Sequence, residues 1–134
     1  MIEYMLDTNI CIYIIKRKPE SVLDRFRQFP ISSLGISSIT LSELEYGVMK
    51  SSKPDQNQFA LSQFAAPFEI LPYGDEAAQY YGALRADLEK QGTPIGSLDM
   101  LIAAHALSIN CTLVTNNEKE FSRVPYLHIE NWIF

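Results

Sequence analysis

A short apolar run that ends abruptly in an acid constrains the fold of this chain more than any other feature. Within the first nine residues, an apolar run that suits a buried strand reaches Leu6, and Asp7 follows it directly. A second apolar stretch, residues 10–15, has the length of a short helix. A strand that leads into a helix places Asp7 at the carboxyl end of the strand, where open α/β sheets hold their ligands. Aspartate is also a favoured helix cap, so Asp7 alone does not decide between a cap and a site.

Length and charge bound the remaining possibilities. The 134 residues are 47% hydrophobic and 20% charged, which predicts a single globular domain over residues 1–134 with one full core. The formal net charge of −5 argues against a protein that coats nucleic acid with a basic surface. It leaves room for an enzyme that holds a nucleic acid through a cation in an acidic cleft.

Cysteine spacing and hydropathy indicate the cellular compartment of the protein. Cys11 and Cys111 lack the spacing of a disulfide framework or a zinc site, so each is expected to fill apolar space in a reducing compartment. The longest apolar run near the start falls far short of the ~20 residues that span a bilayer, and no signal peptide is visible. These observations predict a cytoplasmic protein.

Strand and helix patterns alternate along the rest of the chain. Strands are expected at 34–39, 68–73, 111–115 and near 126–129. Helices are expected at 20–29, 40–49, 55–64, 75–90, 98–107 and 118–121. This alternation predicts an α/β fold, a mostly parallel sheet with helices on both faces. Right-handed crossovers then bring the carboxyl ends of the strands to one edge.

Three acids are predicted to meet at that edge: Asp7, Glu43 and Asp99. Glu43 also fits a capping box that begins at Thr40, and Asp99 also fits a simple acid in the first turn of a helix capped by Ser97. Crowded carboxylates repel and raise their pKa values. A hard divalent cation such as Mg²⁺ removes that cost, and the reaction that fits such a site is phosphodiester hydrolysis.

Four segments of the sequence together carry a family resemblance. They are Leu6-Asp7-Thr8-Asn9, Ile39 to Leu44 with Tyr46-Gly47, Gly92 to Gly96 with Asp99 to Ala103, and Val114 to Phe121. The chain resembles PIN-domain ribonucleases in the same order over its whole length, and most of all the VapC toxins of bacterial toxin–antitoxin pairs. The resemblance implies a three-layer α/β/α sandwich and cleavage of structured RNA such as tRNA with Mg²⁺ or Mn²⁺, which blocks translation. It also implies a homodimer, a VapB-type antitoxin, and a larger complex on operator DNA through that antitoxin.

The resemblance also implies roles for individual residues. The acids around the metal are matched by Asp7, Asp99 and Glu43, the last either directly or through water. The polar positions that orient these acids are matched by Thr8, Asn9 and Thr115.

Two further positions are less regular. The fourth acidic position of the family falls on Asn117, an amide whose oxygen can coordinate a metal without adding charge. Glu120 matches a variable acidic position that would help a second ion only through water. Separately, the basic run of Lys16, Arg17 and Lys18 fits contacts with RNA phosphates, and equally an ordinary solvated helix end.

Two other classes of protein compete with a nuclease. An aspartyl-nucleophile phosphatase would use Asp7 to attack phosphorus, but that class has a second acid two residues on, where this chain has Asn9. A non-catalytic partner-binding domain would have no reason to respond to Mn²⁺. A carboxylate-dependent gain in stability on Mn²⁺ titration therefore separates a nuclease from a binding domain.

Overall fold

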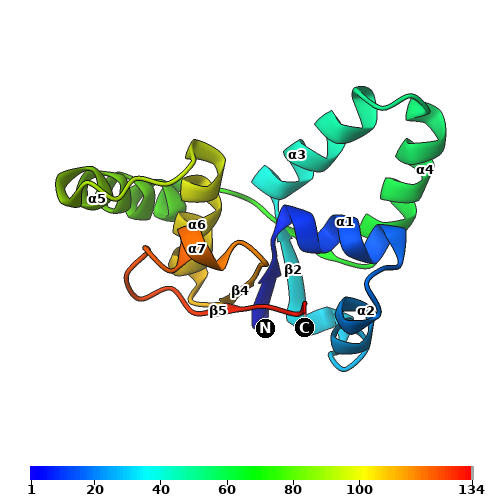
Figure 1. Cartoon of the computed structure of the whole chain (residues 1–134), viewed down its shortest axis with the longest axis horizontal. Helices are drawn as coiled ribbons and strands as arrows, with labels where there is room; N and C mark the ends of the chain where they lie inside the picture. Colours follow the sequence, from blue (N-terminus) through cyan, green and yellow to red (C-terminus); the bar gives the residue numbers. More distant parts are fainter. Residues whose placement is uncertain (134) are drawn as a thin grey trace.

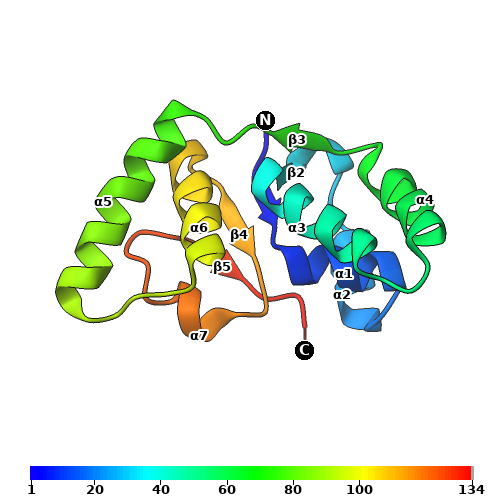
Figure 2. The ribbon, with the colours of Figure 1, turned by 90° about the horizontal axis from the view of Figure 1, so that it is seen from above.

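A five-stranded parallel sheet forms the centre of the molecule (Figures 1 and 2). The computed structural model describes residues 1–133. The strands follow the order β3-β2-β1-β4-β5, and every neighbouring pair is parallel, which confirms the predicted α/β class. Their bounds are β1 Tyr4–Leu6, β2 Leu34–Ser37, β3 Glu69–Leu71, β4 Thr112–Val114 and β5 Ile129–Glu130.

Helices cover both faces of this sheet. They are α1 Thr8–Lys16, α2 Glu20–Phe26, the 3₁₀ turn η1 Ile31–Ser33, α3 Ser38–Met49, α4 Pro54–Ala65, α5 Asp75–Gln91, α6 Ser97–Ile109 and α7 Glu118–Phe121. Figure 2 shows α5, α6 and α7 on one side of the sheet and α1 to α4 on the other. Because side chains alternate along a strand, Met5 and Leu113 enter the core under α5 and α6, whereas Leu6 and Val114 enter the core under α1 to α4.

Helix α6 is the most deeply buried helix, as its apolar sequence predicts. Its buried residues include Met100 and the run from Ile102 to Ala106. The small side chains of Ala103 and Ala106 let neighbouring elements approach closely. Among residues 1–133, no helix combines the length and apolar character that crossing a membrane requires.

The predicted capping box at the start of α3 was wrong. The helix begins at Ser38, and its cap is Ser37, whose Oγ accepts the backbone N–H of Ile39 at 3.1 Å. Because the helix begins at residue 38 and not at residue 40, the strand before it ends two residues earlier than predicted. Glu43 therefore lies in the second turn and not at the positive end of the helix. At α6 the cap is Gly96 and not Ser97, and Asp99 lies in the first turn as predicted.

Candidate active site

Asp7 is held by hydrogen bonds to both of its carboxylate oxygens. It caps α1, with Oδ1 accepting the backbone N–H of Thr8 at 2.8 Å. Its Oδ2 accepts the hydroxyl of Thr115, which follows β4, at 2.7 Å. Only 4% of Asp7 is exposed, and this burial raises the pKa of its carboxyl group, partly opposed by the two hydrogen bonds and reinforced by the charge of Glu43. Asp7 is thus both a helix cap and a buried acid at the strand end.

Glu43 is joined to Asp7 through one residue, Thr8. The Thr8 hydroxyl donates to Oε1 of Glu43 at 2.7 Å, while its backbone N–H donates to Oδ1 of Asp7. Thr8 was predicted to orient the acids, and this geometry is what such a role requires. Glu43 reaches the site from the second turn of α3 by the length of its side chain.

Asp99 has the most strongly perturbed carboxyl group of the site. Its pKa is raised to about 7, first by burial, then by a hydrogen bond with Glu120, and then by the charges of Asp7, Glu120 and Glu43. These three electrostatic partners lie at the cap of α1, in α3 and in α7, and Asp99 itself lies in α6. The structure therefore brings together the acids that the sequence predicted at one edge of the sheet.

Asn117 lies inside this group of acids. Its side-chain amide nitrogen donates to Oδ2 of Asp99 at 3.3 Å and to Oε2 of Glu120 at 3.0 Å, and its backbone N–H donates to Thr115 Oγ1 at 2.9 Å. The hydrogen bonds from Asp99 and Asn117 lower the pKa of Glu120. In this arrangement Asn117 faces the carboxylates as a donor, with its nitrogen and not its oxygen towards them.

Asn9 belongs to a polar chain at the rim. Its amide nitrogen donates to Oδ1 of Asn116 at 3.5 Å, and Asn116 donates to the hydroxyl of Tyr13 at 3.1 Å. The hydrogen bond of Asn9 thus runs to an amide and not to a carboxylate. Sequence reasoning missed Tyr13, because it sits in an apolar helical run and only its hydroxyl distinguishes it there.

The basic residues lie away from the acids. Lys16 ends α1, Arg17 caps it in a left-handed conformation with φ of 60°, and Lys18 follows, all three exposed. Asp7 caps the opposite end of α1, roughly 13 Å away for nine residues at ~1.5 Å each. The structure therefore does not bring this run to the acids.

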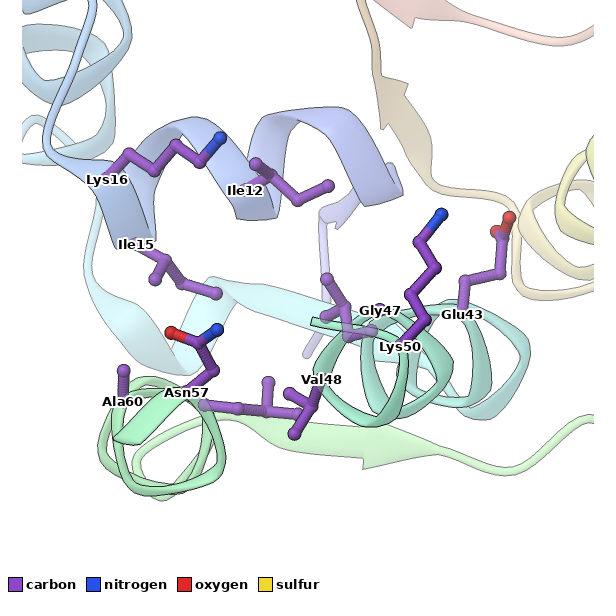
Figure 3. A pocket seen from close by; sticks show the side chains of 11 residues that line it. Ile12, Ile15, Lys16, Glu43, Gly47, Val48, Lys50, Asn57 and Ala60 are labelled. Carbon is purple, nitrogen blue, oxygen red and sulfur yellow. The ribbon is translucent and has the colours of Figure 1, made fainter. Parts of the chain in front are cut away.

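An elongated pocket leads from Glu43 towards Lys16 between α1, α3 and α4 (Figure 3). Its volume is about 380 Å³. Apolar side chains form most of its wall, among them Ile12, Ile15, Leu44, Val48 and Leu61. Figure 3 shows Glu43 at one end and Ile15 and Ala60 at the other. An apolar segment that filled this pocket would reach an acid of the site.

The donor set has the chemistry of a hard-cation site, although it is loosely assembled. Within residues 1–133, no three His, Cys, Asp or Glu side chains are grouped tightly enough to form a ready-made metal cage. Separate donors hold the carboxylates, since Thr8 holds Glu43 and Asn117 holds Asp99. Mg²⁺ keeps several waters and needs only one or two direct carboxylates, so a hydrated ion suits these oxygen donors.

Comparisons with known proteins agree with this geometry. The PIN domain family model matches residues 4–127. Ribonuclease VapC2 of Rickettsia felis is 49% identical over 130 residues, which cover 96% of this chain and 97% of that protein. The tRNA(fMet)-specific endonuclease VapC of Salmonella typhimurium is 46% identical over 132 residues, 98% of this chain and 99% of that protein.

A solved structure extends the similarity to three dimensions. The toxin chain in the crystal structure of DNA-bound VapBC from Salmonella typhimurium superposes with a TM-score of 0.94 at 46% identity, covering 99% of this chain and 100% of that chain. The similarity in sequence and in structure spans both faces of the sheet and the acidic edge. The chain therefore belongs to the PIN-domain family, in its VapC ribonuclease branch.

Proposed function

We propose that this protein is a metal-dependent endoribonuclease toxin that cuts structured RNA at the acidic edge of its sheet and is neutralised by a VapB-type antitoxin. The observation that carries the proposal is the placement of Asp7, Glu43 and Asp99, from the cap of α1, from α3 and from α6, so close that the charges of Asp7 and Glu43 contribute to the raised pKa of Asp99. Without a cation, the mutual repulsion of these acids costs free energy, and a bound cation offsets that cost. Acids in a solvated surface network are screened by water and need no cation to offset their repulsion.

In this proposal Asp7 and Asp99 hold Mg²⁺ or Mn²⁺, and Glu43 contributes directly or through water. When bound, the ion supplies positive charge beside the phosphate and acidifies water. Thr115 orients Asp7, Thr8 orients Glu43 and Asn117 orients Asp99, each through the hydrogen bonds described above. Glu120 adds negative charge next to Asp99 and is the residue that would attract a second ion through water.

The proposed substrate class is tRNA. The relative from Salmonella typhimurium is named a tRNA(fMet)-specific endonuclease and shares 46% identity over almost its full length. The net charge of −5 supports an enzyme that meets RNA through a bound cation and a few basic residues, and not through a broadly basic surface. Lys16, Arg17 and Lys18 would contact RNA phosphates at a distance from the cut, because α1 separates them from Asp7.

The proposed partner is a small antitoxin with a basic inhibitory segment. The pocket that begins at Glu43 supports this, since an apolar segment in it would bring a following Arg to the carboxylates. Related VapBC proteins have been crystallised together on DNA. By extension, we propose a homodimeric toxin in a toxin–antitoxin complex that reaches operator DNA through the antitoxin.

The test is end-mapping of cellular RNA after a brief pulse of expression, with Asp99→Asn as the matched inactive protein. New 5′ ends confined to one or a few tRNAs, absent with Asp99→Asn, are the expected result. Identical ends in both samples would reject the proposal. A phosphatase would leave RNA ends unchanged, and a binding domain would neither cut RNA nor gain stability with Mn²⁺.

A further inference from the structure

A buried histidine, His105, links helix α6, which carries Asp99, to the start of helix α3, which carries Glu43. His105 of α6 and Ser37, the cap of α3, are 2% and 0% exposed, and the distance from His105 Nδ1 to Ser37 Oγ is 2.8 Å. The rings of His105 and Tyr73 also pack in a T-shaped arrangement, with ring centroids 5.6 Å apart. No sequence motif predicted this pair, and the proposed chemistry does not use it.

The neighbours of this pair suit one set of hydrogen-bond directions. Ser37 Oγ accepts the N–H of Ile39, and its hydroxyl hydrogen can be donated to His105 Nδ1 when the ring proton is on the other nitrogen. The backbone of Pro72 is a second partner of His105, and because proline offers only a carbonyl acceptor, a ring N–H of His105 is the group that can donate to it. Burial lowers the pKa of His105, which keeps the ring neutral with one donor and one acceptor nitrogen.

The contact with Ser37 ties the helix of Asp99 to the start of the helix of Glu43, and the contact with Pro72 ties it to the loop after β3. Apolar packing joins the two helices near the start of α3, where Ile39 packs against the core cluster of α6, whereas Leu44 and Val48 of α3 enter the other cluster. Figure 2 shows α3 and α6 on the two sides of the N-terminal strand. Ser37 fixes where α3 begins, six residues before Glu43, and His105 lies six residues after Asp99.

We propose that His105 is a positioning residue of the acidic site, which sets the separation of Asp99 and Glu43 by holding α6 against the cap of α3 and the carbonyl of Pro72. This inference rests on the proposed function, in which both acids serve one metal ion. A hydrocarbon side chain would fill the same space without the cost of burying a polar ring. The polar ring gains its advantage by fixing the relative direction of the packed elements, since Ser37 and the backbone of Pro72 are its defined partners.

The experiment measures Mn²⁺ affinity by calorimetry and steady-state RNA cleavage in His105→Leu, at a temperature where the protein is folded. We expect Mn²⁺ binding to weaken about 10-fold or more, as happens when partners that orient metal ligands are removed, and kcat to fall more than KM for RNA rises. His105→Asn, whose amide oxygen can still accept from Ser37, should recover part of the affinity. Val22→Ala, a cavity in the opposite core, is the control for lost stability and should bind Mn²⁺ normally.

The outcomes separate this inference from the proposed function. If Asp99→Ala abolishes Mn²⁺ binding while His105→Leu keeps the wild-type affinity, His105 only fills the core and the inference is overturned. If Asp99→Ala binds Mn²⁺ normally, the site itself is wrong and the inference fails with it. If His105→Leu does not fold, Ser37→Ala removes the same hydrogen bond with the ring in place, and unchanged affinity there overturns the inference.

Discussion

The hydroxyl of Thr8 donates a 2.7 Å hydrogen bond to Oε1 of Glu43, across 35 positions of sequence. The same residue donates its backbone N–H to Asp7, so a single threonine holds two acids that repel each other. Valine has the shape of threonine without its donor. The Thr8 hydroxyl is therefore the group to remove in a test of whether the link between these acids matters.

We expect Thr8→Val to bind Mn²⁺ more weakly and to cleave RNA more slowly. Glu43 loses its hydrogen bond and is free to swing away from Asp7. The free energy of unfolding should change by only about 1 kcal/mol, because Thr8 is half-buried and its backbone cap to Asp7 remains. Thr8→Ser keeps the hydroxyl and serves as the control. Calorimetric Mn²⁺ titration beside thermal unfolding makes the comparison, and equal affinity in both variants would contradict this role.

Asp7→Ala and Asp99→Ala should both abolish cleavage, with opposite effects on the stability of the metal-free protein. Asp7→Ala removes a helix cap, typically worth about 1 kcal/mol, and leaves the buried Thr115 hydroxyl without its acceptor. Asp99→Ala removes a carboxyl group that its acidic neighbours and burial disfavour, so stability should hold or rise. Denaturant unfolding in EDTA measures both, and a large loss of stability in Asp99→Ala would show that the repulsion is unimportant.

The position of the acids could be predicted from sequence because it depends on local signals. Asp7 follows a strand, and Asp99 follows a break rich in glycine and proline, so the topology of a parallel sheet brings them to one edge. The cap of α3 could not be placed in the same way. Residues 37, 38, 40 and 42 are all Ser or Thr, and each is a plausible cap by local chemistry.

The hydrogen-bond networks lay beyond sequence reasoning for a different reason. The contacts Thr8–Glu43, Asn116–Tyr13 and Ser37–His105 join residues 35, 103 and 68 positions apart. Each depends on how two elements pack against each other, and no periodicity within one element records that. The resemblance identified Thr8 as a polar position that orients the acids but did not say which acid it contacts. Its hydrogen bond to Glu43 explains why a hydroxyl is needed there.

The stability of the folded protein should fall at acidic pH through His105. Burial lowers the pKa of this ring below its ordinary value of 6.5, so the unfolded chain binds a proton more readily than the folded one. Stability is therefore full above pH 6.5 and is lost as pH falls from 6.5 towards the lowered value. His105→Asn has no such group, so the difference in Tm between it and the wild type should shrink as pH falls through this window. A constant difference would show that His105 titrates alike in both states.

Inhibition by the proposed antitoxin should weaken as salt rises. The toxin carries a formal charge of −5, and the proposed inhibitory segment presents Arg to carboxylates at the open edge of the site. Salt screens exposed charges over about 8–10 Å at physiological strength, which slows association first. Replacing that Arg by Gln in the antitoxin should remove most of the salt dependence. Inhibition that is equally strong from low to high salt would point to a docking mode that is purely apolar.

Asn117→Asp should tighten Mn²⁺ binding while it destabilises the metal-free protein. The amide donates to both Asp99 and Glu120, so a carboxylate in its place replaces two attractions with two repulsions. With a cation present the added charge becomes favourable, by up to ~4 kcal/mol at about 4 Å and an effective dielectric near ~20 before desolvation is subtracted. Affinity should rise roughly tenfold for each ~1.4 kcal/mol that survives.

The control for charge is Asn117→Ala, which removes the donor without adding a carboxylate. It should lose less cleavage activity than Asp7→Ala, because Asp99 and Glu120 remain as oxygen donors. Cleavage by Asn117→Asp need not be faster than wild type, since an ion held more tightly can also hold the product. Calorimetric Mn²⁺ titration and unfolding in EDTA give the two halves of the prediction. Unchanged affinity in Asn117→Asp would place this position outside the reach of the ion. Unchanged stability of the metal-free protein would mean that the hydrogen bonds donated by Asn117 do not offset the repulsion between Asp99 and Glu120.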